Sequence, residues 1–156
     1  MKNKRTSTIS QLRKILLVLC LGGAACVQAQ TKTNWLNIMG DPQDPTVNTI
    51  EVDPTPVSQS NEGRVMRVRV SRSAERISSR GINYRSFESR VLFDCTNSTA
   101  RYLSADLYLE PGWKGVSHHT SVYDGPPQLM AFRDIEPNPA QRILRAACHS
   151  SSISSN

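Results

Sequence analysis

The sequence predicts a single exported domain of the α+β class, in which an antiparallel sheet carries one C-terminal helix and one disulfide. Three observations predict it. Several segments alternate apolar and polar residues with the period of two that marks a half-buried strand. Residues 140–148 change to the period of a helix. Only Cys95 and Cys148 remain once an N-terminal export signal is removed.

Residues 1–29 have the three parts of a cleavable secretory signal. Five cations and no acid precede an apolar run at 15–25, and compact residues at 27–29 fit the peptidase site. That run has eleven residues, whereas a helix that crosses a bilayer needs roughly 20. We therefore expect Gln30 to be the mature N-terminus. The alternative is a lipoprotein box that would acylate Cys26, although Gly stands three positions before it, where a branched apolar residue is usual.

Removal of the signal changes the charge balance. The chain has 19 Lys+Arg and 13 Asp+Glu, and the signal holds five of the cations, so the mature chain is close to neutral. A nucleic-acid partner is therefore not expected. The remaining length suits one domain at 30–149, followed by a serine-rich tail at 150–156 that we expect to be disordered.

The two remaining cysteines, Cys95 and Cys148, most simply form one disulfide, because exported proteins meet an oxidising environment. The alternatives are a metal site or two free thiols. A zinc site would need two more ligands at suitable spacing, and no histidine supplies them.

The N-terminal part of the domain predicts two short strands. Segments 35–39 and 49–53 are short and largely apolar, and prolines follow each of them. Residues 58–63 are polar and predict a turn.

A third strand is predicted at 66–70, where apolar residues and arginines alternate. Arg67 and Arg69 therefore share one face of this strand and point to solvent. Residues 71–83 are polar and weakly patterned, and we interpret them as a long connection.

Three further strands are predicted at 84–95, 101–110 and 115–123. The first is expected to be the longest of the sheet and the last to be its final strand. In 101–110, Leu103 and Ala105 should share one face and Tyr102 the other. Because the connections are short, the six strands favour an antiparallel meander.

The C-terminal segment predicts one helix. Asn138 suits the N-cap and Pro139 the first position. An apolar stripe follows at helical spacing, formed by Ala140, Ile143, Leu144, Ala147 and Cys148. Since Cys95 ends the longest predicted strand, a bond to Cys148 would fasten the helix to the sheet.

No pattern for catalysis, metal binding or a cofactor is found in the sequence. His118 and His119 are neighbours on a predicted strand, so they point to opposite faces and cannot chelate one ion together. No Gly-x-Ser-x-Gly elbow or glycine-rich phosphate loop is present, and the carboxylates are scattered. We expect a protein that is not an enzyme.

A local excess of arginine is the one uneven feature. Residues 64–90 contain eight arginines against two glutamates. Arginine binds carboxylate, sulfate and phosphate groups through two parallel hydrogen bonds. The hypothesis is a basic face that meets an anionic glycan, lipid head groups or an acidic protein, and the alternative is a solvated sheet face. The candidate binding residues are Arg67, Arg69, Arg85 and Arg90.

The order of several short motifs resembles the surface-adhesin protein E family. The motifs span 35–148 and are Trp35, Val52-Asp53-Pro54, Phe93-Asp94-Cys95, Tyr102, Gly112-Trp113, Pro137-Asn138-Pro139 and Arg145-Ala146-Ala147-Cys148. The resemblance implies a six-stranded antiparallel sheet with a C-terminal helix packed on it and a disulfide from strand to helix. It also implies a dimer-forming adhesin that binds host matrix proteins such as laminin and vitronectin.

The function predicted from these observations is a non-enzymatic binding module of the bacterial envelope, in the periplasm or at the cell surface, with a protein or an anionic glycan or lipid surface as partner. The adhesive part of this prediction depends on the resemblance alone. The alternative is a soluble periplasmic protein that binds a small ligand or inhibits an enzyme. No matrix-binding segment can be matched residue by residue.

Overall fold

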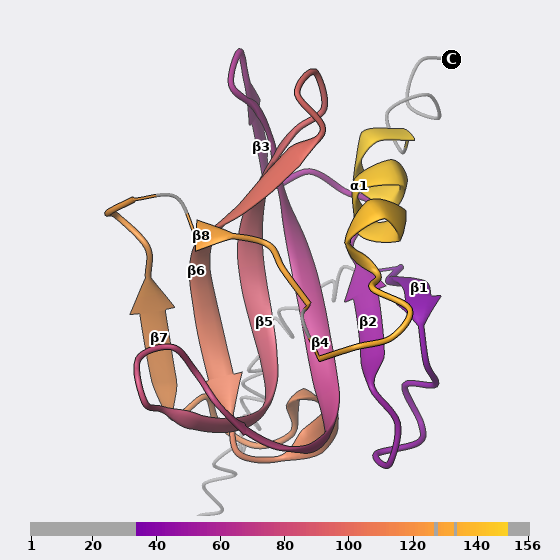
Figure 1. The fold of residues 1–156 in the computed structure, drawn as a ribbon, viewed down its shortest axis with the longest axis vertical. Coiled ribbons are helices and arrows are strands. Elements are labelled where there is room, and N and C mark those ends of the chain that lie inside the picture. Colours follow the sequence, from indigo (N-terminus) through magenta and orange to yellow (C-terminus); the bar gives the residue numbers. More distant parts are fainter. Residues whose placement is uncertain (1–33, 127, 133, 150–156) are drawn as a thin grey trace, which may run out of the picture. The chain divides into compact units, whose positions relative to one another are not determined.

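A computed structural model describes residues 34–126, 128–132 and 134–149 (Figure 1). The predicted signal at 1–29 and the predicted tail at 150–156 lie outside the described residues. The sheet contains β1 (Leu36–Met39), β2 (Thr49–Val52), β3 (Ser58–Ser60), β4 (Gly63–Ile77), β5 (Asn83–Asp94), β6 (Thr99–Tyr108), β7 (His119–Val122) and β8 (Gln128–Leu129). A short 3-10 helix, η1 (Pro111–Trp113), follows β6, and α1 (Ala140–His149) completes the described part of the chain.

The strands pair antiparallel in the order β1-β2-β4-β5-β6-β7, with β3 beside β4 and β8 beside β6. The predicted six-stranded meander with one C-terminal helix is therefore confirmed. Two short strands, β3 and β8, extend it. The predicted final strand at 115–123 is shorter, 119–122, and is not the last, because β8 follows it.

The predicted turn at 58–63 is a hairpin in which β3 pairs with the start of β4. Gly63 makes this pairing fit. Its φ is 136°, and a Cβ atom built on it would lie 2.2 Å from the Phe93 carbonyl oxygen of the neighbouring strand. Only glycine adopts this conformation and permits so close an approach.

The prediction of a long connection at 71–83 is wrong, because β4 continues to Ile77 and is the longest strand. Its pairing with β5 is irregular between Ser71 and Arg76. Arg85 compensates there, because its guanidinium group donates to the carbonyl oxygens of Arg72 (2.8 Å) and Ser73 (3.0 Å). A side chain thus supplies the donors that the ladder lacks at this bulge.

A second irregularity lies on β6. Arg90 pairs with Ser104 but Val91 pairs with Tyr102, so Leu103 is the extra residue of a β-bulge. The bulge reverses the alternation on its N-terminal side. Tyr102 therefore lies on the core side with Ala105, and the prediction that they occupy opposite faces is wrong.

The hydrophobic core lies on one face of the sheet, between the strands and α1. Buried residues of β2, β4 and β5 pack there against Phe132, Ile135 and the helix: Ile50, Val52, Met66, Val68, Val70, Val91 and Phe93. The helix contributes Ile143, Leu144 and Ala147, which confirms the predicted stripe. Its N-cap is also as predicted, because the Asn138 Oδ1 accepts the Ala140 N–H at 3.0 Å.

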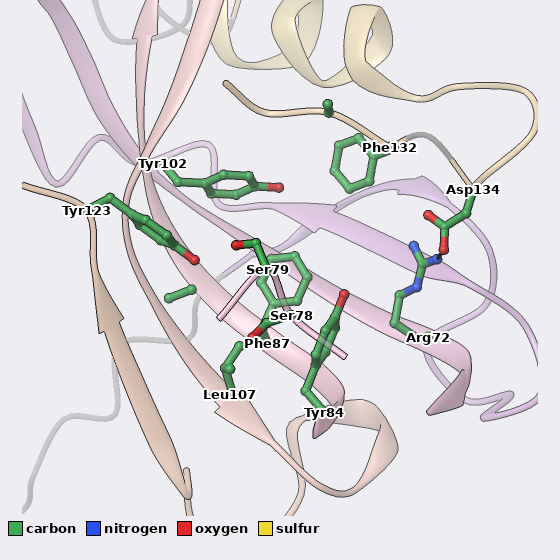
Figure 2. A pocket seen from close by; sticks show the side chains of 12 residues that line it. Arg72, Ser78, Ser79, Tyr84, Phe87, Tyr102, Leu107, Tyr123, Phe132 and Asp134 are labelled. Atoms are coloured by element: carbon green, nitrogen blue, oxygen red, sulfur yellow. Dashed lines mark hydrogen bonds and ion pairs between the residues drawn. The ribbon is translucent and has the colours of Figure 1, made fainter. Parts of the chain in front are cut away.

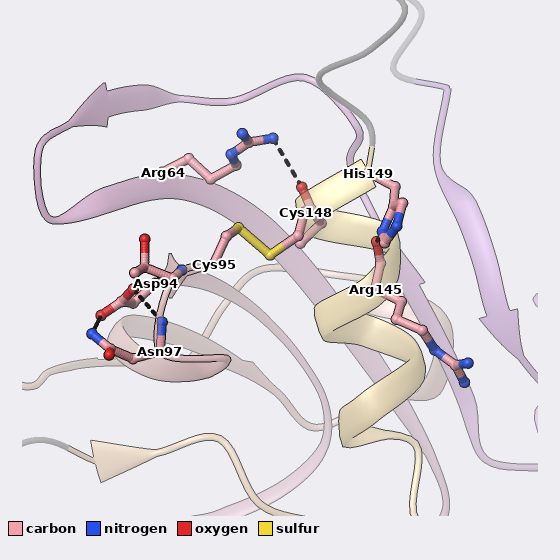
Figure 3. The surroundings of a disulfide bond; sticks show 9 residues. Arg64, Asp94, Cys95, Asn97, Arg145, Cys148 and His149 are labelled. Carbon is pink, nitrogen blue, oxygen red and sulfur yellow. Dashed lines mark hydrogen bonds between the residues drawn. A yellow bond between two sulfur atoms is a disulfide. The ribbon is translucent and has the colours of Figure 1, made fainter.

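The disulfide joins Cys95, directly after β5, to Cys148 in the last turn of α1, with Cα atoms 5.7 Å apart (Figure 3). The predicted pairing is confirmed. Beside it, the Arg64 Nη1 donates to the Ala147 carbonyl at 3.1 Å. A cation at this end of a helix is favourable, because the last carbonyl groups carry the negative end of the helix dipole.

Removal of the cross-link should destabilise the domain without abolishing its fold. The bridge spans 53 residues, and closing a loop of that length contributes about 2–4 kcal/mol. We expect the Cys95→Ser/Cys148→Ser variant to lose that amount of unfolding free energy in urea, measured by circular dichroism. Reduced wild-type protein is the control and should unfold at the same midpoint. If the variant unfolded at the same urea concentration as the oxidised wild-type protein, the disulfide would not stabilise the domain.

Candidate functional site

The face of the sheet opposite α1, here called the polar face, carries the charged side chains of the alternating strands. The pairing register aligns one residue from each of five neighbouring strands in a row across this face: Glu51, Arg69, Glu88, Asp106 and Thr120. Arg67 and Arg90 face each other in the next row. Glu51 and Glu88 both pair directly with Arg69, and such opposite charges stabilise neighbouring strands. The Glu88–Asp106 and Arg67–Arg90 pairs instead place like charges opposite each other, which is unfavourable.

Arg69 lies at the centre of this face, between two tryptophans. Its guanidinium carbon is 4.1 Å from the ring centre of Trp35 and 4.1 Å from that of Trp113. Its Nε donates to the Glu51 carboxylate at 2.8 Å. Glu51 is only 4% exposed, so Arg69 neutralises a buried charge while its guanidinium group contacts both indole rings.

Arg67 repeats this arrangement closer to the end of β2. Its Nη2 contacts the Asp53 carboxylate at 2.5 Å, and Asp53 is 3% exposed. Its Nη1 lies 3.4 Å from Glu88, and its guanidinium carbon lies 5.2 Å from the Trp35 ring centre. Trp35 therefore contacts both arginines.

Trp113 is fixed on the polar face by hydrogen bonds to the sheet. Its indole Nε1 donates to the Phe87 carbonyl and its backbone N–H to the Ser86 Oγ, each at 3.0 Å. The Gly112 N–H donates to the Ser71 Oγ at 3.0 Å. Two buried serines of β4 and β5 thus hold η1 against the strands, so this aromatic contact is rigid.

The four arginines proposed as a basic face occupy different environments. Arg67 and Arg69 are paired with acids, and Arg85 bonds backbone carbonyls at the bulge of β4. Arg90 is exposed, and no ion pair joins it to another residue of the described chain. The structure brings Arg67, Arg69 and Arg90 together on the polar face, while Arg85 serves the backbone. Their role in binding an anion stays a prediction.

Several acidic residues that look scattered along the sequence share the polar face. Glu51 lies on β2 and Asp53 directly after it, while Glu88 comes from β5 and Asp106 from β6. Burial, together with the negative charges of Glu88 and Asp106, raises the pKa of Tyr108 on the same face. The period of two in 49–53 was the signal for these acids, because it places Glu51 and Asp53 on one side of a strand.

The two histidines lie as neighbours at the start of β7, with His118 exposed and His119 half-buried. Within the described ranges, no three His, Cys, Asp or Glu side chains are arranged to hold a metal ion.

The fold and the polar face are typical of a binding domain in which one side of a sheet is buried and the other is presented. The chain belongs to the surface-adhesin protein E family, whose model matches residues 35–149. The resemblance found in the sequence is thereby confirmed. The family indicates a non-enzymatic surface adhesin, and hence an exported or surface protein. No curated protein and no solved structure matches the chain.

In the part of the chain that the structure describes, no helix has the length and apolar character needed to span a bilayer.

The Arg69 contacts predict a large difference between two arginines of the polar face. Arg69→Gln leaves the Glu51 carboxylate buried without its cation, so unfolding free energy should fall by about 3 kcal/mol. Arg90→Gln is the matched control, and because Arg90 is exposed it should change stability by less than about 0.5 kcal/mol. Urea unfolding followed by circular dichroism measures both. Equal losses in the two variants would refute the buried-pair interpretation.

Proposed function

We propose that this chain is the binding domain of an exported bacterial adhesin, and that it engages host matrix proteins through its polar face. The observation that supports the proposal is the cluster of Trp35, Arg69 and Trp113 on this face, with the exposed Arg90 in the next row. Tryptophan, tyrosine and arginine dominate the energetics of protein–protein interfaces. A face on which these residue types are already fixed loses little conformational entropy when a partner binds.

The charge of the polar face favours a protein partner over a polyanion. The pairing register places four arginines and five acids on this face: Arg67, Arg69, Arg90 and Arg101, and Glu51, Asp53, Glu88, Asp94 and Asp106. Heparin-like glycans and anionic lipids are attracted by a surplus of positive charge over a surface. The polar face offers no such surplus, whereas short-range recognition by an exposed arginine and aromatic rings remains available.

The binding proposal can be tested with immobilised laminin and vitronectin. The purified domain should bind at least one of them, and Arg90→Glu should weaken that binding by about tenfold, because it reverses an interfacial charge. Arg142→Glu, on the exposed side of α1, is the matched control and should bind like the parent. Surface plasmon resonance provides the affinities.

Two results would contradict the proposal. One is the absence of binding to both matrix proteins by a domain whose circular dichroism spectrum shows that it is folded. The other is an equal loss of binding in the Arg90 and Arg142 variants. Retention on heparin that Arg90→Glu abolishes would favour the anionic partner instead.

Export can be tested separately by mass spectrometry of the protein purified from its cells. We expect Gln30 to be the first residue, because 27–29 fit the peptidase site. An acylated Cys26 as the first residue would show a membrane anchor, and an intact Met1 would contradict export. Labelling of intact cells then distinguishes surface display from a periplasmic location.

A further inference from the structure

A cavity of about 160 Å³ lies on the helix-bearing side of the sheet, over β5 and β6 (Figure 2). The loop after β4 and residues on both sides of position 133 complete its lining. Five of the twelve residues that line it are aromatic: Tyr84, Phe87, Tyr102, Tyr123 and Phe132. Arg72 and Asp134 lie at one end.

Four of these rings are in contact with one another. The ring centres of Tyr84 and Phe87 are 5.7 Å apart, those of Phe87 and Tyr102 6.2 Å, and those of Tyr102 and Tyr123 6.2 Å. The bulge at Leu103 is what turns Tyr102 to this side. The wall is therefore a continuous aromatic surface drawn from β5, β6 and the residue after β7.

Three tyrosine hydroxyls point toward the middle of the cavity, those of Tyr84, Tyr102 and Tyr123 (Figure 2). None of them forms a hydrogen bond with another described residue. Burial raises the pKa of Tyr84 and of Tyr102, so both stay neutral and can donate as well as accept. All three tyrosines are half-buried and their hydroxyls are open to solvent, so a ligand in the cavity can take the place of water on them.

The charges around the cavity exclude a cationic ligand. Arg72, whose side chain is only 4% exposed, pairs with Asp134, and the Arg76 Nε contacts the same carboxylate at 3.0 Å. The Arg80 guanidinium lies 5.0 Å from the ring centre of Tyr123. These three arginines outnumber the two nearby carboxylates, Asp134 and Asp124, so the aromatic wall would accept a neutral or acidic molecule more readily than an amine.

We propose that this cavity binds one sugar ring, neutral or acidic, at the exposed end of a glycan. A closed cavity of about 150 Å³ holds a ring of the size of benzene. This cavity is open on one side, so a sugar ring can enter it with some of its hydroxyl groups still in solvent. The C–H groups of a sugar can lie on the electron-rich faces of the tyrosines and phenylalanines, while its hydroxyl groups exchange hydrogen bonds with the tyrosines and with Ser78 or Ser79. An aromatic side chain of a protein would fill the same space but leave those hydroxyls unpaired.

The test is a titration of the 15N-labelled domain with the methyl glycosides of glucose, galactose, N-acetylglucosamine and glucuronic acid at millimolar concentrations. At least one sugar should shift the backbone amide signals of Tyr84, Tyr102 and Tyr123 and leave that of Arg90 unchanged. Tyr102→Phe removes one hydroxyl and keeps the ring, so the dissociation constant should rise about fivefold. Tyr108→Phe, the same change on the polar face, should leave it unaltered.

The proposal fails if no sugar of the panel shifts these signals, or if N-acetyltyrosinamide binds more tightly than every sugar. It also fails if Tyr102→Phe and Tyr108→Phe bind alike. Should Tyr102→Phe unfold the domain, Tyr123→Phe replaces it, with the same expected weakening. Binding of matrix proteins through the polar face is tested separately with the Arg90→Glu variant. A negative result for sugar binding in the cavity therefore leaves the proposal for the polar face untouched.

Discussion

A ten-residue helix has to cover the apolar side of a sheet six strands wide, and this constraint shapes the rest of the domain. The helix contacts β1, β2 and β5, and the disulfide holds its last turn to the end of β5. The β6–β7 end of the same side lies beyond its reach. Phe132 and a group of tyrosines cover that end instead. The cavity described above lies between these rings.

On the polar face of the sheet, the constraint is the burial of charged groups. The buried carboxylates of Glu51 on β2 and of Asp53 directly after it need cations, and the cations on β4 in turn contact aromatic rings. A buried ion pair is seldom a net source of stability, because desolvation offsets its attraction. The ion pair mainly fixes the position of the side chains, because Arg69 must lie where Glu51, Trp35 and Trp113 can all contact it. The polar face is thus ordered without a covering layer in the described part of the chain.

Local signals in the sequence were sufficient for the helix, its Asn138 cap, the Cys95–Cys148 bond and the paired strands on either side of position 97. Each depends on residues close in sequence or on a count of two cysteines. The extension of β4 to Ile77 could not be predicted in the same way, because it depends on Arg85 and Asp134, which contact it from distant positions.

The candidate sites were harder to predict for a related reason. Arg67 and Arg69 look basic within their own strand, and only the register with β2 shows that Asp53 and Glu51 neutralise them. Tyr102 was assigned to the wrong side because one extra residue at Leu103 reverses the alternation. Pairing register and bulges are properties of two strands together, and the pattern of a single strand does not contain them.

The bond between Cys95 and Cys148 closes a covalent ring of chain. Tyr102, Tyr123 and Phe132 belong to that ring, whereas Arg72, Tyr84 and Phe87 lie on strands outside it. The aromatic cavity is therefore assembled from two parts of the chain, one of them a loop that thiol chemistry can open. In a reducing compartment the ring would open and be held by packing alone, so one wall of the cavity would lose its covalent constraint.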